Sequence, residues 1–165
     1  MSAYAVSGAT NQVVAIDAAT YTIKGVASTG PAPPAHVIEA PNGKIYVTNA
    51  GDGTVSVYRG GPGLTPVGRI DLGGMPHGLR SADGGGMIVV ANTMAGRLDL
   101  IDPTADRSVG AIPVGRGGPL QVAVTADGRY AYSGVAEPPI SREGRLARAA
   151  SQAAHACPPH RCSCI

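Results

Sequence analysis

Side chains that could bind a ligand recur in this sequence beside Gly-rich turns and linkers. Imidazole, carboxamide and carboxylate groups at one end of neighbouring strands can hydrogen-bond a small polar ligand or a loop of another protein. Two histidines follow stretches rich in Gly and Pro, and two asparagines each lie four residues before a Gly. The candidate ligand-binding residues are His36, His77, Asn49, Asn92 and Asp52.

Each candidate also has a structural interpretation. An Asn at a strand end tolerates the left-handed backbone and hydrogen-bonds its own turn, which would explain Asn49 and Asn92 without a ligand. Asp52 lies in such a turn, where Asp is common for the same local reason. His77 could hydrogen-bond the backbone of a neighbouring repeat, and His36 lies one column from it when the repeats are aligned. For most of these residues the structural interpretation is the stronger one.

Signatures of catalysis and of metal binding are weak. The sequence contains no nucleophile elbow, no phosphate-binding Gly loop and no HExxH motif. Lactone hydrolysis would require a paired acid and base with a cation or a set of donors. The zinc-compatible residues near the C-terminus are His155, Cys157, His160, Cys162 and Cys164. Because they include no C-x2-C pair, we expect no metal site. Because the catalytic motifs are also absent, we expect no catalytic residue and no cofactor.

Composition and charge narrow the function classes. The 165 residues include 24 Gly and 14 Pro but no Phe or Trp, which favours short strands joined by tight turns. Residues 1–136 hold nine basic and nine acidic side chains. A neutral body argues against nucleic acid as a partner, because phosphate binding needs a basic surface. The sequence has no 18-residue apolar run and no signal-peptide pattern, so we expect no membrane span.

The elements that carry these residues repeat along the chain. The string "YVTNAGDGTVSVYR" at residues 46–59 aligns without a gap on "VVANTMAGRLDLID" at residues 89–102, and "YAVSGATNQVVAID" at residues 4–17 falls on the same columns. Between the copies lies a second element with Pro, a short strand and Asn-Gly or Asp-Gly, the dipeptides typical of type I′ hairpin turns. The repeat advances by 42, 43 and 43 residues through the column of Tyr4, Tyr46, Val89 and Tyr132.

Each repeat predicts four antiparallel strands in ~40–45 residues, which is the size of a β-propeller blade. A β-sandwich also has short strands, with turns every ~8–12 residues. A sandwich gives no reason for the same pattern to recur in register every 42 or 43 residues. We therefore expect an all-β fold built of propeller blades.

The unit resembles the YVTN-repeat β-propeller family, whose eponymous motif is Tyr46-Val47-Thr48-Asn49. The strings "MPHGL" at residues 75–79 and "TADGRYAY" at residues 125–132 are similar to that family's first-strand and hairpin patterns. The resemblance implies a bladed propeller, usually seven-bladed and often secreted or periplasmic. It does not imply one activity, since members include envelope and surface-layer proteins and relatives include lactonase-like and quinoprotein dehydrogenase-like propellers.

The strand count falls short of a closed propeller. The pattern predicts three, four, four and then two strands, an incomplete arc of about three blades over residues 1–135, whereas closed propellers have about four to eight blades. At residues 136–165 the composition changes to Arg, Ala, Pro and Cys, so we expect a tail that is irregular, disordered or weakly helical. One hypothesis is a truncated or frame-altered family member. The alternative is self-association, in which two or more arcs complete the ring.

These observations favour a non-catalytic propeller module that acts as a binding or scaffold protein of the cell envelope, with an unknown protein or small ligand as its partner. The alternative is a fragment of a lactonase-like or quinoprotein dehydrogenase-like enzyme, which would need a compact charged pocket where His77 and Asp52 converge. A third interpretation is a decayed product without a selected activity. The resemblance implies a periplasmic or extracellular location, whereas the sequence as written, without an export signal, predicts the cytoplasm.

Overall fold

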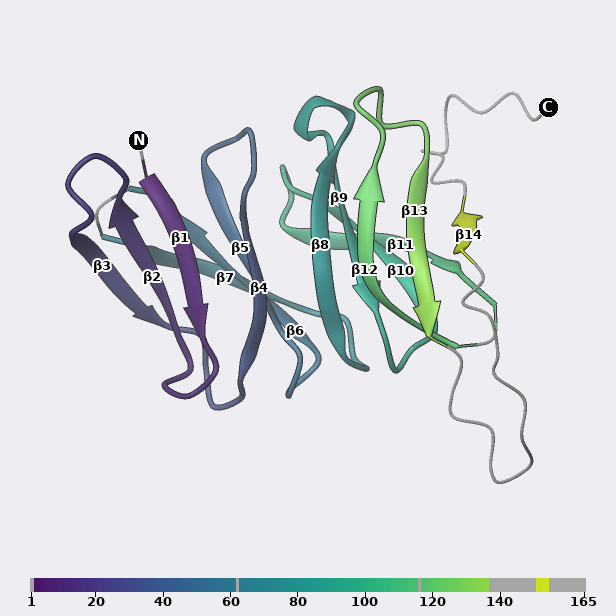
Figure 1. Cartoon of the computed structure of the whole chain (residues 1–165), viewed down its shortest axis with the longest axis horizontal. Helices are drawn as coiled ribbons and strands as arrows, with labels where there is room; N and C mark the ends of the chain where they lie inside the picture. The colour runs from purple at the N-terminus through teal and green to yellow at the C-terminus, as the bar shows by residue number, and fades with distance from the viewer. Residues whose placement is uncertain (1, 62, 116, 137–150, 155–165) are drawn as a thin grey trace.

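The computed structural model describes residues 2–61, 63–115, 117–136 and 151–154, whose strands form an open arc of four antiparallel sheets (Figure 1). Within each sheet, strands that follow one another in the chain are hydrogen-bonded neighbours. We call the sheets blades 1 to 4 in chain order. The arrangement is a partial β-propeller, as the repeat predicted, and the described strands do not close into a ring.

The blades are built as follows. Blade 1 contains β1 (Ser2–Ser7), β2 (Gln12–Asp17) and β3 (Ile23–Ser28). Blade 2 contains β4 (Pro34–Glu39), β5 (Lys44–Asn49), β6 (Thr54–Arg59) and β7 (Thr65–Asp71). Blade 3 contains β8 (Pro76–Ala82), a short 3-10 turn η1 (Asp83–Gly85), β9 (Met87–Asn92), β10 (Arg97–Asp102) and β11 (Arg107–Pro113). Blade 4 contains β12 (Gly118–Val124), β13 (Ala131–Ala136) and β14 (Ser151–Ala154).

The Asn-Gly dipeptide joins β4 to β5, as expected for a hairpin. The N–H of Gly43 donates to the carbonyl of Ala40 at 2.8 Å, and Asn42 Oδ1 accepts the N–H of Lys44 at 3.0 Å. Gly43 has a φ of 76°, while Asn42 keeps a negative φ. The expected type I′ geometry is therefore wrong here. The turn is of type I followed by a left-handed Gly, and the Asn side chain closes it.

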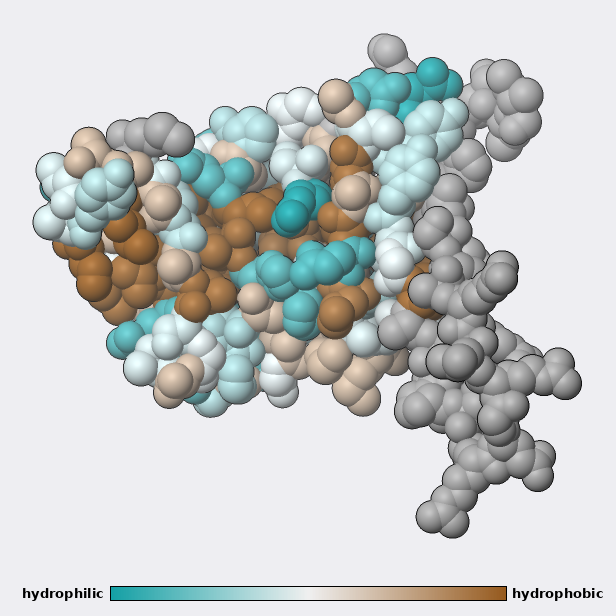
Figure 2. Space-filling view, in the orientation of Figure 1, coloured by the Kyte–Doolittle hydropathy of each residue, from teal (hydrophilic) through white to brown (hydrophobic). Residues whose placement is uncertain are grey.

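The hydrophobic core is divided among the three interfaces between successive blades. The buried residues include Val13, Ala15, Ile45, Val47, Tyr58 and Leu64 between blades 1 and 2; Tyr46, Val55, Val57, Leu79, Ile88, Val90 and Ile101 between blades 2 and 3; and Val89, Ala91, Leu98, Val122, Ala131 and Val135 between blades 3 and 4. Because β5 and β9 are covered on both faces, they carry runs of buried residues and do not alternate. A sandwich would have one core between two sheets, so that alternative is wrong. Figure 2 shows that hydrophobic residues also reach the surface over β2 and β3 at the N-terminal end of the arc.

The strand count agrees with the repeat up to the last blade. Blades 1, 2 and 3 have three, four and four strands as predicted, and blade 4 has β14 besides the two expected. β14 pairs antiparallel with β13, so residues 151–154 form a strand where the sequence predicted an irregular or helical tail. The edge of β13 offers unpaired backbone groups that these residues satisfy. The tail residues other than 136 and 151–154 lie outside the described part. Among the residues that the structure describes, no helix is long and apolar enough to cross a membrane.

Polar contacts join the second strand of blade 2 to a turn of blade 3. The hydroxyl of Tyr46 is hydrogen-bonded to Asp106 Oδ1 at 2.6 Å and lies 3.2 Å from the carbonyl oxygen of Pro103. Lys44 Nζ donates to Asp106 Oδ2 at 2.6 Å and to the Pro103 carbonyl at 3.1 Å. Burial and then the bond to Asp106 raise the pKa of Tyr46 far above its usual range, so the hydroxyl remains a donor. We call Lys44, Tyr46 and Asp106 the inter-blade latch.

We expect Tyr46→Phe to lower the free energy of unfolding by about 1.5–2.5 kcal/mol, because it removes a partly buried hydrogen bond to a carboxylate while the ring still packs. Tyr4→Phe is the matched control. Tyr4 occupies the same column of the repeat and accepts the N–H of Gly61 in blade 2 at 3.4 Å, so its loss should stay below about 1 kcal/mol. Urea unfolding of both variants measures the difference, and equal losses would contradict a special role for the latch.

Candidate functional site

The first strands of blades 2, 3 and 4 bring three polar side chains together. β4 packs against β8, and β8 packs against β12, along the inner side of the arc (Figure 1). Each of these strands has a register shift at the same column of the repeat, which falls between Pro34 and His36, between Pro76 and Leu79, and between Pro119 and Gln121. Such bulges insert one residue and re-aim the side chains around it. His77 lies within the bulge of β8, and His36 and Gln121 directly follow the bulges of their strands.

His36 is the centre of this inner-strand cluster. Its ring meets the ring of His77 edge to face, with 4.8 Å between the centroids. Its Nε2 is hydrogen-bonded to the carboxamide nitrogen of Gln121 at 2.8 Å. Because a carboxamide nitrogen can only donate, this bond selects the neutral imidazole that carries its proton on Nδ1. The two histidines are partly buried and Gln121 is exposed, so the cluster faces solvent.

Gly78 makes this cluster possible. His36, Gly78 and Gln121 occupy one column of the repeat, in three neighbouring blades. A Cβ atom at Gly78 would lie 2.5 Å from Gln121 Oε1 and 2.9 Å from the carbonyl oxygen of Leu120. The missing side chain thus lets the residues on either side of β8 reach each other.

The electrostatics of the cluster favour an uncharged ring at His36. Partial burial is the main cause that lowers the pKa of His36 below its ordinary 6.5, and the neighbouring His77 and Arg80 lower it further. Nδ1 of His77 is buried and has no hydrogen-bond partner among the described residues. Near neutral pH the His36 ring and the Gln121 carboxamide are therefore neutral hydrogen-bonding groups beside the cation of Arg80.

Thr48 fixes the spacing of the two histidine-bearing strands. Its hydroxyl donates to the carbonyl of His77 at 2.7 Å and accepts the backbone N–H of His36 at 3.1 Å. The hydroxyl of Thr93 donates in the same way to the carbonyl of Pro119, which joins blade 3 to blade 4 at 2.7 Å. The sequence suggested that His77 hydrogen-bonds the backbone of a neighbouring repeat, whereas its own backbone carbonyl accepts a side chain of that repeat.

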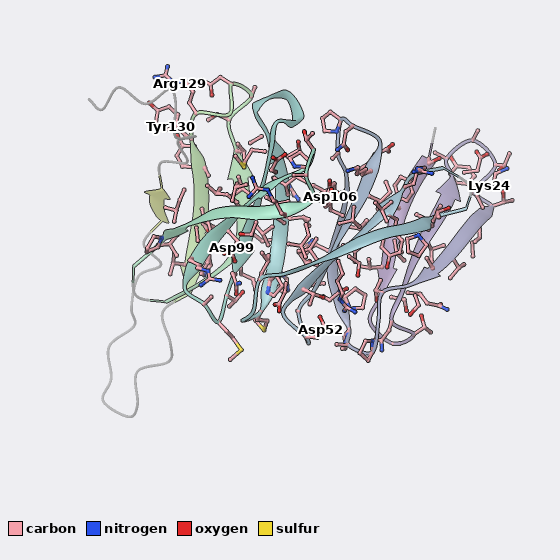
Figure 3. The ribbon with its side chains drawn as sticks, turned by 180° about the vertical axis from the view of Figure 1, so that it is seen from behind. Lys24, Asp52, Asp99, Asp106, Arg129 and Tyr130 are labelled. Carbon is pink, nitrogen blue, oxygen red and sulfur yellow. The ribbon has the colours of Figure 1, made fainter. Side chains whose placement is uncertain are left out.

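The five predicted residues do not converge on one site. His36 and His77 meet on the inner strands, whereas the two asparagines and Asp52 belong to networks described below. Figure 3 shows that Asp52, Asp99 and Asp106 lie well apart from one another. In the described part of the chain, no three His, Cys, Asp or Glu side chains gather closely enough to hold a metal ion. The zinc-compatible residues near the C-terminus lie outside that part.

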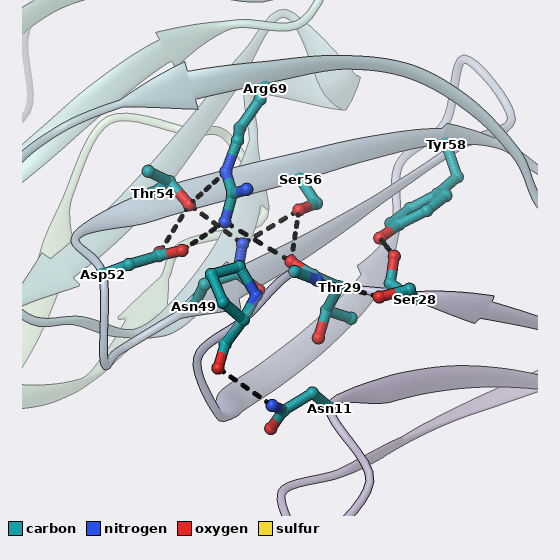
Figure 4. A network of polar contacts seen from close by, with 11 residues as sticks. Asn11, Ser28, Thr29, Asn49, Asp52, Thr54, Ser56, Tyr58 and Arg69 are labelled. Carbon is teal, nitrogen blue, oxygen red and sulfur yellow. Dashed lines mark hydrogen bonds and ion pairs between the residues drawn. The ribbon is translucent and has the colours of Figure 1, made fainter.

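Asn49 and Asp52 hold the turn between β5 and β6 (Figure 4). Asn49 is fully buried, and its Nδ2 donates to Thr54 Oγ1 at 3.0 Å and to Ser56 Oγ at 2.9 Å. Asp52 forms an ion pair with Arg69 and accepts the hydroxyl of Thr54 at 2.7 Å. These bonds support the structural interpretation of both residues.

Asn92 has the same position in blade 3 but stronger partners. It is fully buried, and its Oδ1 accepts the N–H of Met75 at 2.9 Å. Its Nδ2 donates to the carbonyl of Gly73 at 2.9 Å and to Asp99 Oδ2 at 2.7 Å. Asp99 is also buried and accepts Arg97 Nε at 2.8 Å. Asn92 thus fastens the linker that enters blade 3 to the strands of that blade.

An arginine reaches the preceding linker in both complete blades, but from different strands. Arg69 on β7 donates to the carbonyl of Thr29 at 3.4 Å, and Arg97 on β10 donates to the carbonyl of Leu72 at 2.8 Å. The two carbonyls are equivalent, because Thr29 and Leu72 lie 43 residues apart in the repeat. In each blade the guanidinium also pairs with the nearby carboxylate, which is therefore engaged in structure.

Sequence reasoning did not identify four of these residues, namely Gln121, Arg69, Arg97 and Asp99. Gln121 had a signal, because it shares a column with His36 and lies two residues after a Pro in the repeated first-strand element. No sequence signal pointed to the two arginines, since they occupy different columns of the repeat. Asp99 takes the place of Ser56 in its column. The role of this carboxylate is evident only from its ion pair with Arg97.

Comparison with known proteins bears on the fold. No protein-family model and no curated protein sequence matches the chain. Among solved structures, hydrazine synthase from Kuenenia stuttgartiensis is similar with a TM-score of 0.77 and 22% identity, over 84% of this chain and 40% of that one. A protein of unknown function from Desulfotomaculum acetoxidans has a TM-score of 0.71 and 10% identity, over 79% and 42%. The chain spans about two fifths of each structure, and likeness at such identity shows the fold alone.

Replacing Asn92 should cost more stability than replacing Asn49. We expect Asn92→Ala to lower the free energy of unfolding by about 2–4 kcal/mol, because the buried carboxylate of Asp99 loses a hydrogen bond. Asn49→Ala removes bonds to two neutral hydroxyls and should lower it by about 1–2 kcal/mol. Denaturant unfolding with comparable slopes would measure both values. A larger loss for Asn49→Ala would contradict the assignment of the stronger network to blade 3.

The lowered pKa of His36 predicts a pH dependence of stability. Below pH 6.5, its ordinary pKa, the unfolded chain takes up the proton before the folded chain does, so the free energy of unfolding should fall as the pH decreases. We expect His36→Gln to flatten this slope between about pH 7 and pH 5. Asp127→Asn is the control, since the pKa of that carboxyl lies below 3.8. An unchanged slope in His36→Gln would contradict the prediction.

Proposed function

We propose that the chain is a non-catalytic propeller module of the YVTN-repeat type that binds a protein or small polar ligand at the cell envelope. One observation carries the proposal. The asparagine and aspartate side chains that the sequence nominated are engaged in bonds within their blades, whereas His36, His77 and Gln121 form an accessible cluster of hydrogen-bonding groups across three blades. Such a cluster can recognise a polar group through hydrogen bonds.

The chemistry of the cluster indicates the type of group that it would bind. The imidazoles and the carboxamide offer both donors and acceptors, and Arg80 is the nearby cation that acts on His36. Carbonyl oxygens, carboxamides and hydroxyls of a peptide loop or a sugar match these groups better than a phosphate does, because phosphate recognition uses several cations. We therefore propose a neutral or weakly acidic polar partner.

The motif that carries the family resemblance has structural roles in this chain. Tyr46 belongs to the inter-blade latch, Val47 lies in the core between blades 1 and 2, Thr48 clamps the inner strands and Asn49 holds its turn. These roles support a module whose repeated residues build the scaffold, with specificity left to the inner-strand cluster. The periplasmic or extracellular location is proposed from the resemblance.

The competing proposal, a fragment of a lactonase-like or quinoprotein dehydrogenase-like enzyme, relies on the same pair of histidines. It would need His77 and Asp52 to converge, and Asp52 is instead paired with Arg69. A binding function is therefore the better supported of the two.

A capture experiment with matched variants tests the proposal. The full chain, His36→Ala/Gln121→Ala and Lys24→Ala would be immobilised and exposed to an envelope extract of the source organism. We expect at least one protein or glycan to bind the full chain and Lys24→Ala but not the double variant, because Lys24 is an exposed residue on β3 of blade 1, outside the three blades that carry the cluster. Equal retention by all three would contradict the proposal. Lactone hydrolysis or quinone-dependent dye reduction that is lost in His77→Ala would favour the enzyme.

A further inference from the structure

Blade 1 exposes an apolar sheet face at the N-terminal end of the arc. The strand registers place Ala5 opposite Val14 and Val14 opposite Val26, and they place Ala3 opposite Ile16 and Ile16 opposite Ile23. Because residues opposite one another share a face, these side chains form one apolar surface, which we call the open face: Ala3, Ala5, Val14, Ile16, Ile23 and Val26. Ile23 is 66% exposed and Val26 is 47% exposed. Figure 2 shows this concentration of hydrophobic residues over β2 and β3.

The same columns are buried in the next two blades. Ala3, Ala5 and Ile16 correspond to Ile45, Val47 and Tyr58 in blade 2, which pack against blade 1. In blade 3 the corresponding residues are Ile88, Val90 and Ile101, which pack against blade 2. All six of these corresponding residues are at most 2% exposed. The open face therefore corresponds to the surface by which blades 2 and 3 pack against the blade before them.

A turn beside the open face shows the same pattern. Tyr21 lies four residues after the end of β2, as Asp106 lies four residues after the end of β10, and both have a positive φ. Asp106 is bound by Tyr46 of the preceding blade, and Leu64, in the corresponding turn of blade 2, is buried against blade 1. Tyr21 is 85% exposed. It is an apolar turn residue at a place where the other blades contact a predecessor.

The other end of the arc carries the complementary feature. Tyr132 on β13 occupies the column of Tyr4 and Tyr46, whose hydroxyls contact a turn of the following blade. Tyr132 is 48% exposed on the last described blade. It thus has the position of a latch tyrosine, and the turn that it would contact in a following blade corresponds to the turn of Tyr21.

We propose that the open face of blade 1 binds the Tyr132 side of blade 4 in a second copy of this chain, through a head-to-tail contact that repeats the internal blade interface. Both partner surfaces correspond to surfaces that are buried at the blade interfaces of the same chain. The proposed contact therefore continues an arrangement that the chain already contains three times. A head-to-tail contact closes when the rotation per copy fits a ring. Two arcs of three to four blades each would fall within the size of known propellers, which have about four to eight blades. This inference does not depend on the proposed binding function.

The mass of the full chain in solution is the first test. Sedimentation velocity from about 1 to 100 µM, a range that covers ordinary specific associations, should show a dimer. Ile23→Arg and Tyr132→Asp should each raise the dissociation constant about tenfold or more, because each places a charge in an apolar contact. A wild-type chain that remains monomeric throughout would overturn the proposal.

Matched controls separate this surface from others. Val67→Asp and Val109→Asp change apolar residues of similar exposure, 45% and 42%, on the outer strands of blades 2 and 3. They should leave the association unchanged, and circular dichroism with urea unfolding would show that all four variants fold. Equal weakening by the controls, or none by Ile23→Arg, would overturn the proposal.

Mixing two defective variants tests the head-to-tail geometry itself. An Ile23→Arg copy keeps an intact Tyr132 side, and a Tyr132→Asp copy keeps an intact open face. An equimolar mixture should therefore form a heterodimer through one unaltered contact, although neither variant associates well alone. A symmetric contact between two open faces would leave Tyr132→Asp alone as associated as the wild-type chain and would give no gain on mixing, and that result would overturn the proposal.

Discussion

The structure depends on one constraint, which is that each blade is apolar on both faces and needs a neighbour on each side. Burial of apolar surface is the main favourable contribution to folding, and here it occurs between sheets and not within one central core. The polar contacts serve this stacking. The latch of Tyr46 and Asp106 and the clamps of Thr48 and Thr93 all run from one blade to the next.

The hydrogen bonds of the buried polar residues explain why the polar side chains at the strand ends have structural roles in this chain. A buried carboxamide or carboxylate is costly unless its hydrogen bonds are satisfied, and Asn92, Asp99 and Arg97 satisfy one another. In blade 2 neutral hydroxyls accept from Asn49 Nδ2 and a guanidinium comes from β7, while Asn49 Oδ1 is buried without a hydrogen-bond partner among the described residues. The side chains of these networks are thus engaged in structure.

The sequence was sufficient for the topology but not for the side-chain networks. A period of 42 or 43 residues with turn dipeptides determines the strand order, because each unit is a local meander. The pairing of His36 with Gln121 could not be read from it, since the two meet across the missing side chain of Gly78. The conformation of the Asn42-Gly43 turn was also mispredicted, because Gly is compatible with more than one turn type. The strand β14 was missed because nothing in an Ala-rich segment predicts pairing with the edge of β13.

The candidate binding cluster and the open face are physically separate, and this separation has a consequence for recognition. The cluster uses the inner strands of blades 2 to 4, whereas association would cover the front of blade 1 and the back of blade 4. Pairing of two copies would therefore leave both clusters accessible on the inner side of one ring. Two identical sites held at a fixed distance bind a repetitive partner more tightly than one site does. Neutral hydrogen-bonding groups such as His36 and Gln121 supply weak contacts, so two clusters held in one ring would gain most from this effect.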